Sequence, residues 1–143
     1  ASFVRDRAAA LAATWPEVVA ADPGGVALVH GDLHVDNVIV GPDGPLLADL
    51  ELAGVGPSSY DVAPAVVAVA RYGAPAASLE AFLAAYGRDP RSWPGFATCV
   101  DVYELWVTAW AVGVRERSAA AAAEADRRVR CLRTHACEPW HLR

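Results

Sequence analysis

The sequence predicts an α+β fold that is mainly helical and carries one small β-hairpin. Three observations lead to this prediction. Apolar residues recur at helical spacing over residues 3–21 and again over most of the chain beyond residue 60. Short β-rich runs occur only between these helical parts. With 143 residues and 55% hydrophobic content, the chain has the size of one globular domain, so we expect a single domain over residues 1–143.

The elements are expected in a simple order. A first helix over residues 3–21 ends at an Asp-Pro-Gly-Gly turn. Three β-rich runs follow, with the sequences "VALVH", "NVIV" and "PLLADLEL", and a Gly-Pro-Asp-Gly turn joins the last two into a hairpin. Beyond the hairpin the periodicity predicts helices over residues 60–72, 79–86, 96–117 and 119–133.

Charge and composition exclude several classes of partner. The formal net charge of -5 and the dispersed arginines argue against a surface that binds nucleic-acid phosphates. We find no apolar run of transmembrane length, and charges occupy the place where a signal peptide would need an apolar centre. Three cysteines are too few for a disulfide scaffold. We therefore expect a cytoplasmic protein with neither a nucleic acid nor a membrane as partner.

The segment "VHGDLHVDNVIV" places polar side chains between apolar flanks that are typical of a buried strand. His30, Asp32 and Asn37 fit the pattern H-x-D-L-x-x-x-N, and these residue types suit phosphoryl transfer. The carboxylate of Asp32 can accept the proton of an attacking hydroxyl. Asn37 and Asp49 carry oxygens that suit magnesium, and the hairpin would bring Asp49 back beside Asn37. Glu51 would project to the same side of an extended chain as Asp49.

The stretch "HGDLHVDNVIV" followed by "LLADLELAGVGPSSYDVA" resembles the catalytic and metal-binding segments of the aminoglycoside phosphotransferase and choline kinase-like family, relatives of the protein kinases. The resemblance implies a protein kinase-like C-terminal lobe: a helical bundle with a small β-hairpin that carries the catalytic and metal-binding loops. It also implies ATP or GTP as phosphate donor, Mg²⁺ as cofactor, and a small-molecule hydroxyl as acceptor.

The resemblance also assigns expected roles. The catalytic residues are then Asp32 as the base, His30 as a support of the loop, and His34, which follows the base by two residues. Asn37 and Asp49 bind nucleotide-associated magnesium, and Glu51 either joins them or is a surface carboxylate. The carboxylate of Asp61 ties the turn before a helix to the catalytic loop, and it also fits a helix cap.

Kinases of this kind also have an N-terminal lobe, which carries a glycine-rich phosphate cover and a lysine. We find no sheet before the polar loop, and all 12 basic residues are arginine. We therefore expect the chain to be the C-terminal lobe of a longer phosphotransferase, with the N-terminal lobe as its missing partner. By itself it is expected to be inactive.

Two acidic residues of the helix expected over 96–117, Asp101 and Glu104, are weaker candidates for contact with a cationic substrate. They lie three residues apart beside Tyr103, Trp106 and Trp110. The competing interpretation is a solvated acidic edge over an aromatic core stripe. A neutral substrate is the remaining alternative to a cationic one.

Two other functions compete with the phosphotransferase hypothesis, and the C-terminus carries a separate candidate metal site. The alternation of His30, Asp32, His34 and Asp36 resembles ligands of a metallohydrolase. A degenerate kinase-like lobe could serve as a non-catalytic binding module. The C-terminal residues Cys131, His135, Cys137 and His141 have a spacing that could bind zinc.

Overall fold

The computed structural model describes residues 2–136 and 138–141. It confirms an α+β fold that is mainly helical. The helices are α1 (Ser2–Ala21), α2 (Ala63–Tyr72), α3 (Ala76–Tyr86), α4 (Phe96–Gly113) and α5 (Ala119–Thr134), and the strands are β1 (Val26–Val29), β2 (Val38–Gly41), β3 (Gly44–Leu47) and β4 (Gly54–Pro57).

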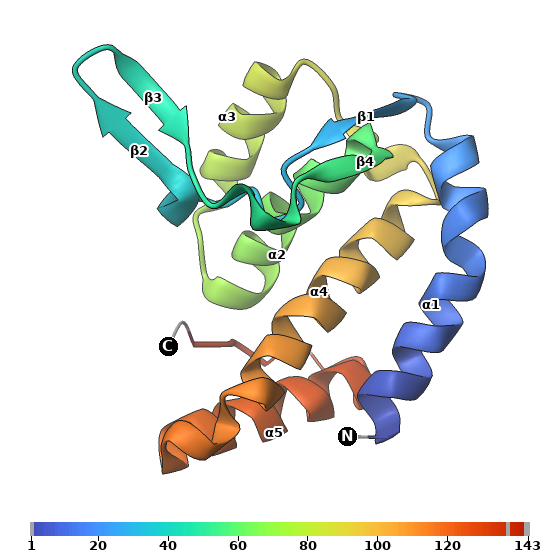
Figure 1. Ribbon diagram of the computed structural model, residues 1–143, viewed down its shortest axis with the longest axis vertical. Helices are drawn as coiled ribbons and strands as arrows, with labels where there is room; N and C mark the ends of the chain where they lie inside the picture. Colours follow the sequence, from blue (N-terminus) through green and yellow to red (C-terminus); the bar gives the residue numbers. More distant parts are fainter. Residues whose placement is uncertain (1, 137, 142–143) are drawn as a thin grey trace.

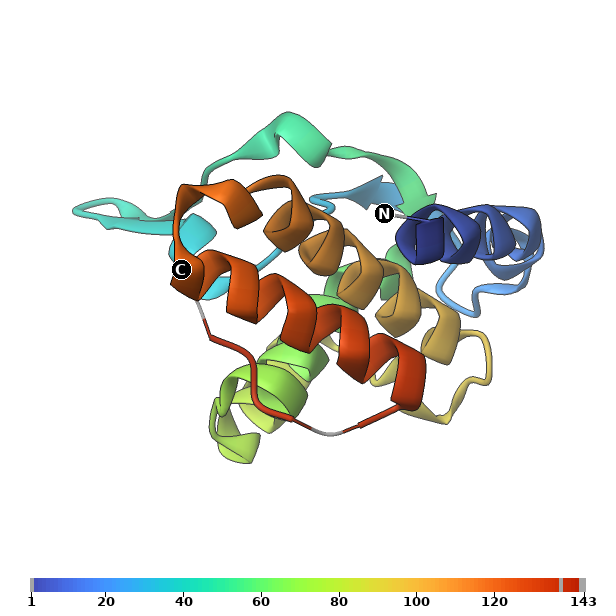
Figure 2. The same ribbon diagram turned by 90° about the horizontal axis from the view of Figure 1, so that it is seen from below.

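Helix α4 is the centre of the helical body. It packs against α1, α2 and α5, and Figures 1 and 2 show it between these helices. The core contains Val62 and Val67 from around α2, Phe96 and Cys99 from α4, and Cys131 from α5. Burying these side chains supplies most of the driving force that holds the helices together.

The strands form two separate two-stranded antiparallel sheets. β1 pairs with β4, so that Leu28 lies opposite Val55, and β2 pairs with β3. The β2–β3 hairpin was predicted, whereas no strand was predicted over residues 54–57, which form β4. Its sequence, Gly-Val-Gly-Pro, has little strand propensity of its own, and the pairing with β1 decides its conformation.

The hairpin projects from the body of the molecule (Figure 1). We expected this hairpin to pack on the helices, but side chains on both of its strands, such as Val40 and Leu46, are exposed. Its base lies at the polar loop, where the backbone N–H of Ala48 donates to the carbonyl of Asn37 at 2.9 Å.

Three predicted helix boundaries are also wrong. The helix expected from residue 79 begins at Ala76, directly after Pro75. The helix expected from residue 60 begins at Ala63, after a 3-10 turn over Ser58–Val62. Pro64 cannot donate a backbone hydrogen bond, so the α-helical ladder does not extend into the preceding turn. The helix expected to reach residue 117 ends at Gly113, since glycine disfavours the helix interior, and a short 3-10 turn follows.

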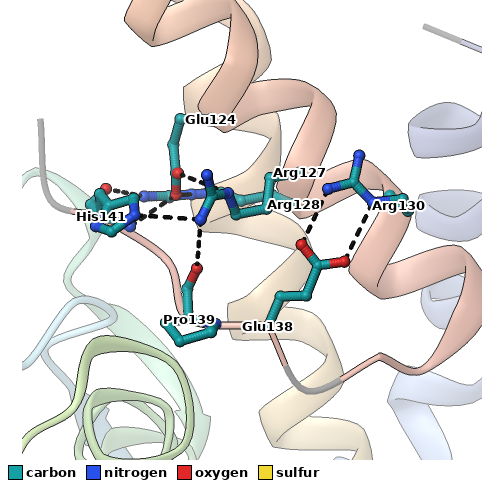
Figure 3. Close-up of polar contacts among 7 residues, drawn as sticks. All are labelled: Glu124, Arg127, Arg128, Arg130, Glu138, Pro139 and His141. Carbon is teal, nitrogen blue, oxygen red and sulfur yellow. Dashed lines mark hydrogen bonds and ion pairs between the residues drawn. The ribbon is translucent and has the colours of Figure 1, made fainter.

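Residues 138–141 run back along α5 (Figure 3). Glu124 accepts a hydrogen bond from the backbone N–H of His141 at 2.9 Å, and Arg128 donates to the carbonyl of His141 at 2.8 Å. Trp140 is buried, with the guanidinium of Arg128 over its ring. This segment therefore closes one side of the helical body. Within the described residues, no helix has both the length and the apolar composition needed to cross a membrane.

Candidate active site

The loop that follows β1 is anchored by the carboxylate of Asp61. One oxygen of Asp61 accepts from the backbone N–H of His30 at 2.7 Å, and the other accepts from Gly31 at 3.0 Å. Asp61 thus ties the turn before α2 to the loop, as expected. It is not a helix cap, because Val62 is the N-terminal cap residue of α2 and no side chain caps that end.

The buried imidazole of His30 connects the loop to the segment that follows β3. Its Nδ1 accepts from the backbone N–H of Asp32 at 3.3 Å, and its Nε2 lies 2.9 Å from the carbonyl oxygen of Ala48. A nitrogen that accepts cannot carry the proton, so the proton of the neutral ring belongs on Nε2. His30 therefore positions the backbone of Asp32 relative to the residue that precedes Asp49.

The half-buried carboxylate of Asp32 is oriented by a residue far away in the chain. The hydroxyl of Tyr103 on α4 donates to Oδ1 at 2.9 Å, and Nε2 of His34 lies 3.6 Å from Oδ2. Burial acts to raise the pKa of Asp32, but His34 and the Tyr103 hydrogen bond outweigh it and hold the pKa below its ordinary value. Asp32 is therefore an ionised carboxylate with one oxygen fixed.

The imidazole of His34 lies between two carboxylates. Its Nδ1 is 3.7 Å from the exposed carboxylate of Asp36. The interaction with Asp32 raises the pKa of His34 above its ordinary value, with smaller contributions from the charges of Asp36 and Asp49, while burial opposes the shift. The loop thus holds a histidine with an increased tendency to be positively charged next to Asp32.

Asn37 and Asp49 lie at the base of the hairpin, which confirms that the hairpin brings these positions together. The buried amide of Asn37 donates from Nδ2 to the carbonyl of Asp32 at 2.9 Å, which leaves its Oδ1 for another ligand. Asp49 has φ 59° and ψ 59°, a left-handed conformation that residues with a side chain rarely adopt. Such strain is common at functional sites.

Glu51 does not follow Asp49 on an extended strand. A 3-10 turn over Leu50–Leu52 comes directly after Asp49. The premise that both carboxylates share a strand face is therefore wrong, because β3 ends at Leu47 and neither carboxylate lies on a strand. Both side chains nevertheless line the same cleft.

The oxygens of Asn37 and Asp49 are hard ligands that suit Mg²⁺, which usually takes only one or two protein ligands and completes its shell with phosphate oxygens and water. Among the described residues, no three His, Cys, Asp or Glu side chains are arranged to hold a metal ion. This finding gives no support to a metallohydrolase centre built from His30, Asp32, His34 and Asp36.

The arrangement of the C-terminal side chains does not support the zinc hypothesis. Cys131 is buried in the core, and the ring of His141 lies 3.2 Å from the guanidinium of Arg127. Of the four proposed ligands, Cys137 lies outside the described residues. Within the described part of the chain, no metal-binding group is formed by Cys131, His135 and His141.

An open cleft of about 1290 Å³ lies beside the polar loop. Asp32, His34, Asp49 and Glu51 line it from the loop side, and α2, α3 and α4 line it with mostly apolar side chains. The cleft is large enough for a small molecule next to the carboxylate of Asp32.

Asp101 and Glu104 do not reach this cleft. Glu104 is buried in an ion pair with Arg71 at 2.6 Å, and Asp101 pairs with Arg7 at 2.6 Å. Both pairs line a separate cavity of only about 30 Å³. The structure thus places them apart from Asp32, and the interpretation of Glu104 as a solvated edge is wrong.

The positions of the aromatic residues of α4 at the site were not predicted from the sequence. Tyr103 contacts Asp32, while Trp106 and Trp110 are 40% and 44% exposed and line the cleft. The two tryptophans are therefore not part of a core stripe, whereas Tyr103 is buried in the core as that interpretation expected. Helical periodicity could place the three on one broad face of the helix, but no local pattern could identify a partner 71 residues away for Tyr103.

An ionised carboxylate with a fixed orientation, next to hard oxygen ligands and an open cleft, is typical of enzymes that transfer phosphoryl groups to alcohols. The comparison with protein families leads to the same class. The model of the phosphotransferase enzyme family matches residues 3–96, and the chain therefore belongs to that family. Comparison with curated proteins and with solved structures found no match. The matched region ends where α4 begins, so Tyr103 and the two tryptophans lie beyond it.

Proposed function

We propose that the protein is a small-molecule kinase that transfers the γ-phosphate of ATP or GTP to a hydroxyl group, and that this chain is its catalytic C-terminal lobe. The observation that carries the proposal is the carboxylate of Asp32, oriented by Tyr103 and placed beside Asn37 and Asp49 at an open cleft. Membership of the phosphotransferase enzyme family supports the class of reaction.

Asp32 is the proposed general base. Since Tyr103 occupies Oδ1, Oδ2 is the oxygen that faces the acceptor hydroxyl. The acceptor oxygen bonds to the γ-phosphorus while the bond from that phosphorus to the bridging oxygen breaks. The nucleoside diphosphate leaves with the electron pair, and the hydroxyl proton goes to Asp32.

His30 and Asp61 position the loop, and they do not act on the substrate in this proposal. Asp61 accepts two backbone hydrogen bonds, and His30 is buried between the backbones of Asp32 and Ala48. His34 is half-buried at the cleft, where its positive charge would stabilise the negative charge that gathers on the transferred phosphate.

Asn37 Oδ1 and the carboxylate of Asp49 are the proposed magnesium ligands. Glu51, which lines the same cleft as Asp49, is proposed to bind the metal or one of its waters. Kinases of this family generally use ATP and Mg²⁺. When bound, the ion neutralises phosphate charge and orients the triphosphate. The chain contains no lysine, so we propose that a separate N-terminal lobe supplies the contact to the other phosphates.

The test is the Asp32→Asn substitution in the intact gene product. We expect turnover to fall about 10²–10⁴-fold, because removal of a general base usually costs that much. Asp43→Asn, in the exposed turn of the hairpin, is the matched control and should keep full turnover. Thermal unfolding should show both variants folded.

The competing functions predict other results. Unimpaired transfer by Asp32→Asn would refute this mechanism. Hydrolysis of substrate without nucleotide would favour a metallohydrolase. Binding of nucleotide with no transfer to any acceptor would favour a non-catalytic module.

A further inference from the structure

The helical side of the cleft is apolar and aromatic. Helices α2, α3 and α4 supply its apolar and aromatic side chains, and α5 adds Arg128; the matched family region ends where α4 begins. The side chains that matter here come in pairs from α2, α3 and α4: Val69 and Tyr72, Leu79 and Phe82, and Trp106 and Trp110. Both tryptophans keep about two-fifths of their surface exposed, at 40% and 44%. Exposed tryptophan rings beside a cleft are suited to bind flat or apolar molecules.

Negative charge in the cleft lies on the loop side only. Four carboxylates line it there, close to where the proposal places magnesium: Asp32, Asp36, Asp49 and Glu51. Among the described residues that α2, α3 and α4 contribute to the lining, none is a carboxylate. The acidic groups of α3 and α4 have other partners, since Glu80 pairs with Arg91 and Glu104 pairs with Arg71. A polycationic acceptor would find no counter-charge on this side.

Among the described residues, one arginine lines the cleft, and it does not offer a site for an anion. Arg128 is buried, with 2% of its surface exposed. Its guanidinium donates to Glu124 at 2.8 Å, to the carbonyl of Val107 at 3.0 Å and to the carbonyl of His141 at 2.8 Å. It also stacks over the ring of Tyr72. These contacts use its donors and its charge, so a carboxylate on the acceptor would lack a partner as well.

We infer that this aromatic wall binds the body of the acceptor, and that the acceptor is an uncharged, largely apolar alcohol with a ring system. The inference rests on the proposed function, because it takes Asp32 as the group that receives the acceptor hydroxyl. Burial of a ring system against Trp106 and Trp110 provides affinity, while the hydroxyl is the only polar group that must reach the loop. The cleft volume of about 1290 Å³ accommodates a multi-ring alcohol.

The first experiment measures binding without nucleotide, so that it does not depend on turnover. The intact protein is titrated with three neutral ring alcohols, β-estradiol, cyclododecanol and erythronolide B, and with the polycation kanamycin. We expect at least one neutral alcohol to bind at least tenfold more tightly than kanamycin. Trp106→Ser and Trp110→Ser should each weaken that binding about tenfold, whereas Val40→Ser on the exposed hairpin should not. Failure of all three alcohols to bind, or tighter binding of kanamycin, would overturn the inference.

A charge placed on the wall gives an independent readout. Ser78 lies in the first turn of α3 and lines the cleft, and its neighbour Ala77 is exposed but is not among the lining residues. We expect Ser78→Asp to tighten kanamycin binding at least threefold and Ala77→Asp to leave it unchanged. An equal effect of the two variants would count against the wall as the binding surface.

Addition of Mg²⁺ and ATP separates this inference from the proposed function. Phosphorylation of a bound neutral alcohol supports both. Binding of the alcohol at the wall with no transfer to any acceptor refutes the kinase proposal. Transfer to kanamycin with no binding of the neutral alcohols refutes the acceptor class and leaves the kinase proposal standing.

Discussion

The hydrogen bond from Tyr103 to Asp32 determines how one carboxylate is presented to the cleft. Burial alone would favour the protonated acid, which could not accept a proton. The phenol and His34 reverse that preference, and the pKa of Asp32 falls below its ordinary value. Burial, followed by the neighbouring Asp32 charge, raises the pKa of Tyr103, so the phenol stays protonated and keeps donating.

Tyr103→Phe should lower kcat about tenfold, because it removes a hydrogen bond to a charged group but keeps the ring. Without that bond the pKa of Asp32 rises toward its ordinary value, so the acid limb of the kcat/KM profile should move to higher pH. Tyr86→Phe is the control, since its hydroxyl donates to the carbonyl of Ser58 at 2.6 Å. An acid limb that stays in place in Tyr103→Phe would refute the positioning role.

Asp22 is a second carboxylate that the structure shows to be important. It accepts from the backbone N–H of Ser59 at 2.9 Å, from the hydroxyl of Ser59 at 2.7 Å and from the N–H of Gly24 at 3.0 Å. Burial acts to raise the pKa of Asp22, but these hydrogen bonds and the charge of Arg88 outweigh it and lower the pKa. Asp22 thus links the end of α1 to the turn before α2.

Asp22→Asn should lower the free energy of unfolding by about 1–3 kcal/mol at pH 7, the usual cost of losing hydrogen bonds to a charged group. Because the folded pKa is depressed, this stabilisation is present above the unfolded pKa of about 3.9 and is lost as pH falls through the folded pKa. Urea denaturation at pH 7, 5, 4 and 3 should therefore show the two proteins converging below pH 4. A constant difference down to pH 3 would contradict the linkage.

The polar loop lies directly against the turn that follows the hairpin, and Gly31 is the point of contact. This glycine has φ +86°, and a Cβ placed on it would lie 2.5 Å from the carbonyl oxygen of Leu52. The backbone of the polar loop therefore approaches the turn after Asp49 more closely than any side chain allows. This close approach keeps Asp32 and Asp49 at the same end of the cleft.

Gly31→Ala should destabilise the protein more than Gly87→Ala. Both glycines have a left-handed conformation, which costs an alanine about 1–2 kcal/mol, but a Cβ on Gly87 meets only open space. The clash with Leu52 adds about 1–3 kcal/mol, and its relief would move the loop. Thermal unfolding and turnover should both show Gly31→Ala as the more damaged variant. Equal melting temperatures would show that the loop tolerates a side chain.

Among the described residues, the proposed contacts to the triphosphate all come from the polar loop and the base of the hairpin. Asp49, one of the proposed magnesium ligands, lines an open cleft, where water screens electrostatic attraction and orientation is not enforced. Arginine has the charge of a lysine but not its compact ammonium group, and the arginine that lines the cleft is buried in other contacts. Positioning and charge neutralisation are what phosphoryl transfer needs most.

The 143-residue chain by itself should therefore bind Mg²⁺–ATP weakly and transfer nothing. Isothermal titration should give little or no heat, and a coupled assay should detect no consumption of ATP. Addition of the proposed N-terminal lobe as a separate polypeptide is the positive control and should restore binding. Tight binding with turnover by the chain alone would refute the need for that lobe.

Patterns within a few residues were enough to predict the class of fold and the motif of the site. Helical periodicity identified the helices, and turn residues located the β2–β3 hairpin. The spacing of His30, Asp32 and Asn37 identified the loop, and the hairpin correctly predicted that Asp49 returns beside Asn37. Such features depend on the local backbone and on side-chain types, which the sequence states directly.

Packing between distant segments decided the rest. Tyr103 orients Asp32, which lies 71 positions earlier in the chain, and Asp61 binds the backbone of Gly31, which lies 30 positions earlier. Glu104 is buried in an ion pair with Arg71 and does not face a substrate. Strand β4 exists because β1 pairs with it. A helix face is apolar in the sequence whether it enters the core or lines a cleft, so only the tertiary structure could show that Trp106 lines the cleft. The periodicity of a helix fixes which side chains share a face, but what that face meets depends on how the helices are assembled.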